Sequence, residues 1–199
     1  IEGNCRLKQA VIRDRKYPNL YLIPSAQTKD KTAVNPEQMK KLTEELKDEF
    51  DYIIIDNSPF KSYLTSCAMC ASDKVITPIC VDNFSYDGLM SLFDTIEELN
   101  DKYALSIEFA GIFMTRVAGR TTLFRQMYES YENMFGDRFL PISIRNCIAV
   151  NESNTTFEPL LTYDKKCPAA LDYVELVNYL GLMDTAHYRK LARYLKGEK

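Results

Sequence analysis

A chain of 199 residues, 46% of them apolar, is long enough to form one domain with a substantial core. The formal net charge of −3 provides no overall attraction to nucleic acid, so any such binding would need a local basic patch. No apolar run is long enough to cross a bilayer, and the first residues do not resemble a signal peptide.

Residues 1–50 predict two helices and a strand. The spacing of apolar residues predicts a short helix over 4–16, and the run NLYLIP predicts a strand over 19–24. A second helix is expected to begin at Pro36, because the Asn35 side chain can cap the first N–H groups and proline suits the first turn. The apolar residues of this helix recur at helical spacing and predict one buried face: Met39, Leu42, Leu46 and Phe50.

The stretch Asp51-Tyr-Ile-Ile-Ile-Asp56 is the main sequence evidence for a ligand site. A continuous β-branched run followed by a turn that contains Pro59 is typical of a strand buried on both faces of a parallel sheet. Asp56 would then lie at the carboxyl end of the strand, the edge at which open α/β sheets bind ligands. A carboxylate at that edge can hold nucleotide-bound Mg²⁺, directly or through water. A buried strand that simply ends in a capping Asp is the alternative, and these residues alone leave both open.

The remainder of the chain continues to alternate strands with helices. Strands are predicted over 74–79, 109–115 and 138–144, and helices over 61–72, 89–103, 124–135, 168–180 and 186–196. This alternation predicts an α/β fold with a mostly parallel sheet and helices on both faces. Because no linker or repeat interrupts it, residues 1–199 are expected to form a single domain, ending in a short basic helix within 184–199.

The six cysteines are irregularly spaced, which favours reduced thiols in a cytosolic protein over a disulfide framework. Cys67 and Cys70 are the only closely spaced pair. A structural zinc site would need further Cys or His ligands, and the only histidine, His187, is expected to face solvent. Ordinary helix cysteines are therefore favoured over a metal site.

A phosphate-binding loop is missing from the sequence. Nucleotide-binding proteins of this class carry G-x-x-x-x-G-K-[ST] between a strand and a helix. None of the seven glycines lies in such a pattern. Any nucleotide site must therefore be argued from other segments.

Several segments resemble a known family of ATPases. Those that closely resemble the MinD septum-placement ATPases are Asn4–Val11 (NCRLKQAV), Asn19–Lys31 (NLYLIPSAQTKDK) and Pro36–Asp56. Those that are more similar to the ParA/Soj partition ATPases are Pro78–Leu89, Ile144–Glu152 and Tyr163–Lys166. The likeness extends to about Leu180 and implies a deviant P-loop NTPase fold of the ParA/MinD, SIMIBI-like type, which dimerises around ATP.

The resemblance also identifies what the chain lacks. The ParA/MinD families begin with a strand, a KGGxGKT loop and a second strand, and this chain starts after all three. It is therefore expected to be the C-terminal portion of such a domain. Removal of central strands would expose a sheet edge and apolar faces. A partner chain or an upstream segment is expected to complete the fold.

The resemblance assigns nucleotide roles to residues in three places. Asp56 matches the Walker B carboxylate, which acts on Mg²⁺ through a water, and Pro59 shapes the adjoining switch loop. Two strand ends flank adenine in the family, largely through backbone groups: Met114 and Thr115 in one, and Ile144, Arg145 and Asn146 in the other. Ile144 replaces the usual proline. Ordinary strand ends remain an equal alternative.

Basic residues raise the question of polyanion binding. Arg120, Arg145, Lys165 and Lys166 fall where ParA-like proteins place non-specific DNA contacts, although a solvated basic surface is an alternative. MinD proteins end in a basic amphipathic membrane helix. The apolar face of the basic tail here is narrow and lacks Phe and Trp, which favours a surface helix over a membrane helix.

Taken with the resemblance, these residues predict an ATPase chain of the ParA/MinD type. In complete form it would bind ATP and Mg²⁺, form a homodimer, and hydrolyse ATP when a ParB- or MinE-like partner activates it. The output would be positioning of DNA or of the division site in the bacterial cytoplasm. The alternative is a truncated or degenerate homologue without catalysis, which acts as a protein-binding module.

Overall fold

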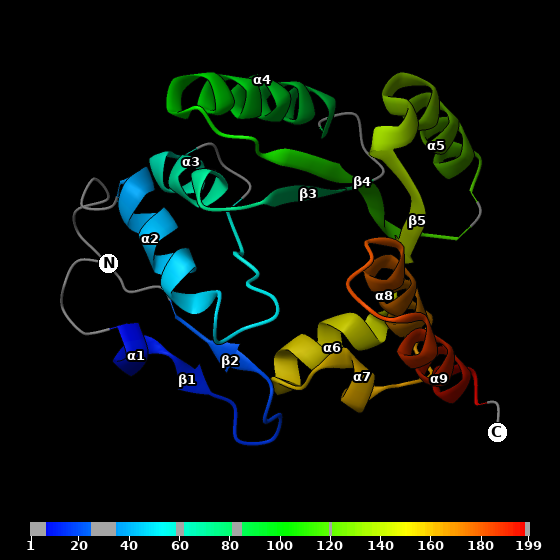
Figure 1. Cartoon of the computed structure of the whole chain (residues 1–199). Coiled ribbons are helices and arrows are strands. Elements are labelled where there is room, and N and C mark those ends of the chain that lie inside the picture. Colours follow the sequence, from blue (N-terminus) through cyan, green and yellow to red (C-terminus); the bar gives the residue numbers. More distant parts are fainter. Residues whose placement is uncertain (1–6, 25–34, 59–61, 81–84, 120, 198–199) are drawn as a thin grey trace. The chain divides into compact units, whose positions relative to one another are not determined.

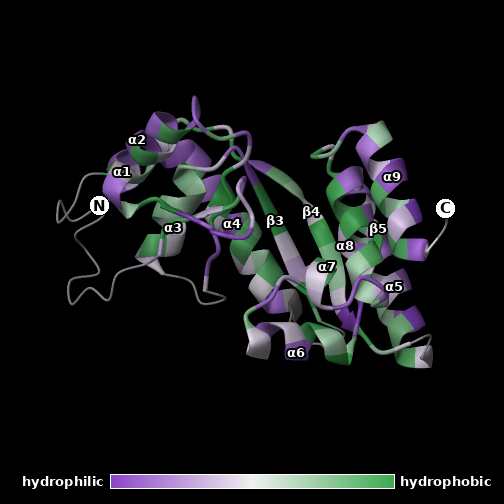
Figure 2. Ribbon diagram, turned by 90° about the horizontal axis from the view of Figure 1, so that it is seen from below, coloured by the Kyte–Doolittle hydropathy of each residue, from purple (hydrophilic) through white to green (hydrophobic). Residues whose placement is uncertain are grey.

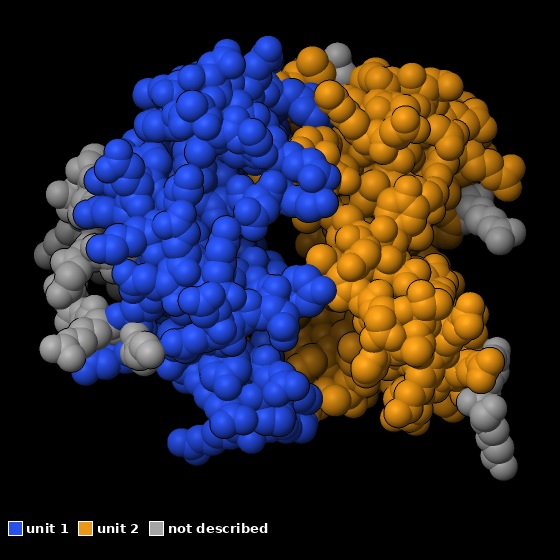
Figure 3. All heavy atoms as spheres, viewed as in Figure 1, with its two compact units in different colours: residues 1–74, 91–108 blue, residues 75–90, 109–199 orange. Residues whose placement is uncertain are grey.

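A computed structural model describes residues 7–24, 35–58, 62–80, 85–119 and 121–197 (Figure 1). The chain divides into two compact units, coloured separately in Figure 3. Unit 1 comprises residues 1–74 and 91–108, and unit 2 comprises residues 75–90 and 109–199. The single-domain organisation expected for 1–199 stays a prediction, and each unit is described by itself.

Unit 1 begins with helix α1 (Leu7–Ala10) and a small hairpin of β1 (Ile12–Arg13) and β2 (Tyr21–Leu22). The prediction of one helix over 4–16 is therefore wrong beyond Ala10. Asp14 explains the break, because its carboxylate accepts hydrogen bonds from the backbone amides of Lys16 and Tyr17. Such local bonds favour a turn over a continuing helix.

Helix α2 (Pro36–Leu46) confirms the predicted cap and helix start. The Asn35 side chain accepts from the Gln38 amide at 2.9 Å, and the Gln38 side chain accepts from the Asn35 amide at 3.1 Å. Helix α3 (Tyr63–Cys70) packs against α2. Met39 of α2 and Cys67 of α3 are buried together, as the apolar spacing of α2 predicts.

Helix α4 (Ser85–Tyr103) begins in unit 2 and continues into unit 1. Its end in unit 1 is joined to the following segment by a hydrogen bond, in which the Ile107 amide donates to the Asn100 side chain at 2.9 Å. The Glu108 amide donates to the Asp73 carbonyl at 3.1 Å. These bonds hold the segments on either side of α4 next to each other.

Unit 2 contains a three-stranded sheet of β3 (Lys74–Ile79), β4 (Glu108–Val117) and β5 (Phe139–Arg145), in that order. β4 and β5 pair in parallel. The helical elements that follow β4 are α5 (Thr122–Phe135), the 3₁₀ turn η1 (Gly136–Arg138), α6 (Ile148–Thr156), α7 (Leu160–Tyr163), α8 (Pro168–Tyr179) and α9 (Thr185–Lys196). A parallel sheet with helices confirms the predicted α/β class.

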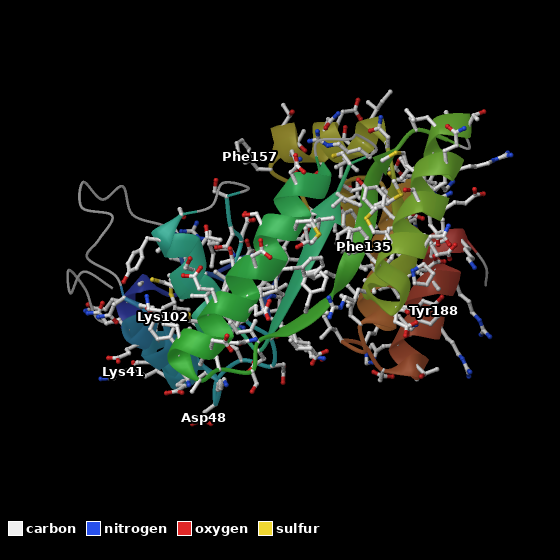
Figure 4. All side chains as sticks on the ribbon, turned by 90° about the horizontal axis from the view of Figure 1, so that it is seen from above. Lys41, Asp48, Lys102, Phe135, Phe157 and Tyr188 are labelled. Carbon is white, nitrogen blue, oxygen red and sulfur yellow. The ribbon has the colours of Figure 1, made fainter. Side chains whose placement is uncertain are left out.

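Apolar side chains of the described residues pack between the strands and helices of unit 2. Helix α8 packs against β5 and brings Ala169, Ala170 and Leu176 into contact with the strand residues Leu140 and Ile144. Aromatic rings join α5 to β5: the Tyr128 and Phe139 ring centroids lie 5.0 Å apart, and Tyr131 stacks on Phe135, which Figure 4 labels at the end of α5. The aromatic contacts hold the start of β5, and the contacts of Ile144 with the α8 cluster hold its carboxyl end.

The buried strand predicted over 51–56 is wrong. Residues 52–58 are not assigned to any strand, and the Ile54 side chain is 90% exposed. Among the described residues no strand pairs with this segment, and a β-strand depends on interstrand hydrogen bonds for its stability. Its β-branched residues therefore remain on the surface of unit 1.

Candidate functional site

Asp56 ends the extended segment of unit 1, and its side chain is exposed to solvent. The neighbouring Asn57 side chain donates a hydrogen bond to the Ile55 carbonyl at 2.9 Å. Pro59, the expected switch-loop residue, lies outside the described residues. Asp56 is thus an accessible oxygen donor, but its predicted position at the end of a buried strand is wrong.

The two strand ends expected to flank adenine both belong to unit 2. β4 continues beyond Met114 and Thr115 to Val117, so these two residues lie before the end of the strand. Met114 is fully buried, which leaves only its backbone able to face a ligand. The Asn146 amide donates to the Val117 carbonyl at 2.9 Å. The structure therefore joins the end of β4 to the residue that follows β5.

The end of β4 has an irregular backbone. The pairing with β5 shifts between Met114 and Val117. Arg116, between them, has φ of +56°, in the left-handed region that non-glycine residues rarely adopt. The surrounding ladder must hold this conformation, which costs about 1–3 kcal/mol. The end of strand β4 is therefore irregular, with a shift in its pairing with β5.

Arg145 is held by Asp172, a residue that the sequence analysis missed. The guanidinium contacts the carboxylate at 2.6 Å, and the Arg145 amide donates to the same carboxylate at 2.9 Å. The Asp172 side chain is 8% exposed, against 50% for that of Arg145. Hydrogen bonds that the guanidinium donates to Asp172 raise the pKa of Arg145, so the guanidinium remains charged. Arg145 therefore anchors β5 to α8.

A sequence signal for this anchor does exist. Asp172 lies in helix α8 among the buried residues Ala169, Ala170, Val174 and Leu176. A carboxylate within such an apolar pattern requires a buried partner. The sequence does not reveal which basic residue supplies it. Ile144, the preceding strand residue, is itself buried in the core of unit 2.

Lys165 and Lys166 are brought together with helix α9. The Lys165 ammonium lies 4.3 Å from the centre of the Tyr194 ring. Both lysines line an open hollow of about 460 Å³, together with Tyr163, Asp164 and Tyr194. Arg145 is engaged by Asp172, and Arg120 lies outside the described residues. The four basic residues named from the sequence are therefore not shown as one patch.

Helix α9 is amphipathic, as Figure 2 shows along its length. Ala192 and Leu195 are buried, and the helix packs against α8. The Asp184 carboxylate caps its start by accepting from the amides of Ala186 and His187. The His187 side chain is exposed, as expected, and contacts Asp184. Among the described helices, none is long and apolar enough to cross a membrane.

Cys67 and Cys70 are both buried in unit 1, and both are free thiols. Burial raises the pKa of each thiol, because it disfavours the charged thiolate. Over the described ranges, no three Cys, His, Asp or Glu side chains gather closely enough to hold a metal ion. The pair therefore has the properties of packed helix residues.

Comparison with known proteins identifies the family. The AAA domain model, AAA_31, matches residues 1–109, which is more than half of the chain. The chromosome-partitioning ATPase Soj of Treponema pallidum is 27% identical over 182 residues, covering 88% of this chain and 72% of Soj. The septum site-determining protein MinD of Bacillus subtilis is 56% identical over 57 residues, covering 28% of this chain and 21% of MinD.

A solved structure supports the same fold. The MinD protein of Pyrococcus horikoshii, complexed with Mg-ADP, superposes with a TM-score of 0.69 at 18% identity, covering 92% of this chain and 74% of that protein. Together with the family model and the relatives, it confirms the predicted resemblance to the ParA/MinD ATPases. The chain belongs to the AAA domain family AAA_31, within the ParA/MinD group of P-loop ATPases.

Proposed function

We propose that this chain is part of a ParA/MinD-type ATPase that, in complete form, binds Mg-ATP, forms a homodimer and hydrolyses ATP to position DNA or the division site in the bacterial cytoplasm. The main support for this proposal is the family match over residues 1–109. The alignment with Soj, which covers 88% of the chain, supports it further. The chain spans 72% of Soj and 21% of Bacillus MinD, so the proposal concerns a longer protein than these residues.

Asp56 is the residue proposed to act on magnesium, through a water, in unit 1. Its exposed carboxylate supplies the hard oxygen donor that Mg²⁺ prefers, so the residue type fits the ion. When bound, Mg²⁺ neutralises charge on the phosphates of a nucleotide. Pro59, which follows in the sequence, is proposed to shape the segment that responds to the terminal phosphate.

The strand ends of unit 2 are proposed to bind the adenine ring. Met114 and Ile144 are buried, so their side chains support the sheet while backbone groups nearby remain to contact a base. Thr115, Arg145 and Asn146 complete the proposed set. The bond from the Asn146 amide to Val117 and the Arg145–Asp172 pair support it, because both hold these backbones rigid.

Slow hydrolysis that depends on an activator follows from the proposed assignments. Phosphoryl transfer to water is driven mainly by positioning and by charge neutralisation. The family supplies lysines for this purpose from a KGGxGKT loop, which this sequence does not contain. The 199 residues alone are therefore expected to turn over ATP very slowly or not at all. A ParB- or MinE-like partner is proposed as the activator of the complete dimer.

The proposal is tested by calorimetric titration of Mg-ATP into this chain and into a longer product of the same gene. Binding by the longer product alone is the expected result, and Asp56→Ala in that product should abolish magnesium-dependent turnover. Failure of both forms to bind would overturn the proposal. Turnover by the 199 residues alone, lost in Asp56→Ala, would contradict the expected inactivity of the isolated chain.

A protein-binding module without catalysis is the second candidate, and the exposed apolar residues of unit 1 favour it. Tyr52, Ile53 and Ile54 lie in an extended segment without a strand partner, and Leu20 and Leu22 are also exposed. Apolar surface of this kind marks sites that another chain covers. Co-purification with a full-length ParA/MinD relative, reduced by Ile54→Asp, would support this role. A monomer indifferent to the relative would exclude it.

Non-specific DNA is a further proposed partner, through Lys165 and Lys166 beside the basic helix α9. Binding should weaken steeply with salt, because lysine–phosphate contacts release counterions. The variant Lys165→Ala/Lys166→Ala should weaken binding to arbitrary duplex DNA. Lys102→Ala is the matched control, since the Lys102 ammonium also lies over a tyrosine ring, at 5.3 Å in α4. Pelleting with anionic liposomes instead of DNA binding would indicate a membrane role.

A further inference from the structure

Two cysteines that play no part in the proposed ATPase each stand directly before a helix of unit 2. Cys147 is the N-cap of α6, and Cys167 is the N-cap of α8. Both are free thiols. They are 20 positions apart in the sequence, with α6 and α7 between them.

The fold brings these two cysteines to one core cluster. Cys167 belongs to the buried cluster between β5 and α8, and Cys147 packs against that same cluster. Contacts made by Arg145 hold the same segments together independently of sulfur. Its guanidinium donates to the Pro168 carbonyl at 3.1 Å and pairs with Asp172, so the residues beside both cysteines are anchored.

The two thiols differ in their access to solvent. Cys167 is 2% exposed, whereas Cys147 is only partly buried. Burial, followed by the neighbouring Cys147 thiol, raises the pKa of Cys167, although the nearby backbone amides of Ala169 and Ala170 oppose this. Cys147 is therefore the thiol that a dissolved oxidant reaches first, and Cys167 is placed to react with it afterwards.

We propose that Cys147 and Cys167 form a reversible disulfide when hydrogen peroxide oxidises the protein. The Cys147 thiolate attacks the peroxide, the O–O bond breaks, and Cys147 becomes a sulfenic acid while one water leaves. The Cys167 thiolate then attacks the Cys147 sulfur, the S–O bond breaks, and a second water leaves. Two thiols have lost two electrons and two protons, and hydrogen peroxide has been reduced to two waters.

The disulfide would close a loop that contains α6 and α7 and would tie the residue after β5 to the start of α8. Its expected consequence is a higher melting temperature for the oxidised protein, because the crosslink restricts the unfolded chain. This inference does not depend on nucleotide binding. Cys67 and Cys70 provide an internal control, because both are buried within one helix and neither offers a solvent-accessible first thiol.

The test uses the full 199-residue chain, reduced and then treated with hydrogen peroxide. After alkylation of the remaining thiols, peptide mapping should find Cys147 joined to Cys167, with the mass of two hydrogens lost and restored by dithiothreitol. Cys147→Ser should abolish this crosslink, since Ser retains a side chain suited to the N-cap. Cys67→Ser/Cys70→Ser should retain it.

A trapping experiment distinguishes the two roles. In Cys167→Ala, the Cys147 sulfenic acid has no partner thiol and should persist, so dimedone should label Cys147. In Cys147→Ser, Cys167 should remain unlabelled because it is buried. Circular dichroism checks that each variant is folded. Recovery of Cys147 and Cys167 as alkylated free thiols from folded, peroxide-treated protein, or their pairing with other cysteines, would overturn the proposal.

Discussion

Residues 51–58 in unit 1 and strand β4 in unit 2 are both rich in apolar and β-branched side chains, yet their surroundings are opposite. Ile54 is 90% exposed, whereas Met114 in β4 is fully buried. β4 lies between two hydrogen-bonded neighbours, and in the described part of the chain residues 52–58 have no strand neighbour. Local propensity is similar in the two stretches. The presence of partner strands decides which stretch becomes a strand.

The two aspartates singled out in these units differ in the same way. Asp56 is exposed at the end of a segment without a strand partner, and Asp172 is buried against the end of β5. A buried carboxylate needs a partner, and Arg145 supplies it. An exposed carboxylate is satisfied by water and is free to bind a cation. Asp172 therefore contributes to stability, while Asp56 is available for function.

Gly111→Ala is expected to have the largest effect, because it disrupts the packing of β4 on β5. A Cβ at this position would lie 2.5 Å from Leu140 Cδ2 and 3.2 Å from the Arg138 carbonyl oxygen, on a backbone with φ of +143°. Overpacking and strain together should lower the free energy of unfolding by about 4 kcal/mol, measured by urea denaturation followed by circular dichroism.

Gly88→Ala is the matched control for that substitution. A Cβ at Gly88 meets nothing within 4 Å, and the residue lies in helix α4. Alanine should therefore raise the free energy of unfolding by up to about 1 kcal/mol through helix propensity. Equal losses at Gly88 and Gly111 would mean that the close approach of β4 to β5 does not exist in solution.

Met114→Ala and Ile54→Ala test the comparison directly. Removal of the fully buried Met114 side chain should cost about 3 kcal/mol, because a cavity remains in the core. Removal of the exposed Ile54 side chain should change the free energy of unfolding by less than about 0.5 kcal/mol. A large loss at Ile54 would show that residues 51–58 are covered in solution, by a second chain or by another segment.

Asp172→Ala and Asp56→Ala compare the two carboxylates. Loss of Asp172 leaves Arg145 without its partner, at an expected cost of about 2 kcal/mol, below the range for a fully buried pair because the Arg145 side chain is half exposed. Asp56→Ala should stay within about 0.5 kcal/mol. Thermal melts of both variants under one buffer condition check the difference, and similar losses would contradict the contrast.

The smallest expected effect concerns helix α9, the last helix of unit 2. Hydrogen bonds from the His187 backbone and side chain lower the pKa of Asp184 below its usual 3.8. Because the folded pKa is lowered, the cap is fully effective above the unfolded pKa and is lost as pH falls through the folded value. Amide exchange in the first turn of α9 should therefore speed up in acid. Asp184→Asn should remove this pH dependence while keeping a capping side chain.

Residues that are neighbours in the sequence were sufficient to predict several helix and strand positions. Asn35 and Pro36 predicted the start of α2, and the strand over 74–79 was predicted with the bounds that β3 has. Capping and apolar periodicity act over a few residues, so sequence neighbours are sufficient to reveal them. The extension of β4 to Val117 was not foreseen, because its last residues depend on pairing with β5.

By itself, the sequence determined the α/β class, the start of α2 and the resemblance to the ParA/MinD ATPases. The tertiary structure decided that residues 51–58 have no strand partner in the described chain, that Arg145 pairs with Asp172, and that Cys147 and Cys167 share one core cluster. The physical reason is the distance along the chain over which each interaction acts. Propensity and capping depend on neighbours along the chain, whereas ladders, buried ion pairs and core clusters require partners that only the folded chain brings together.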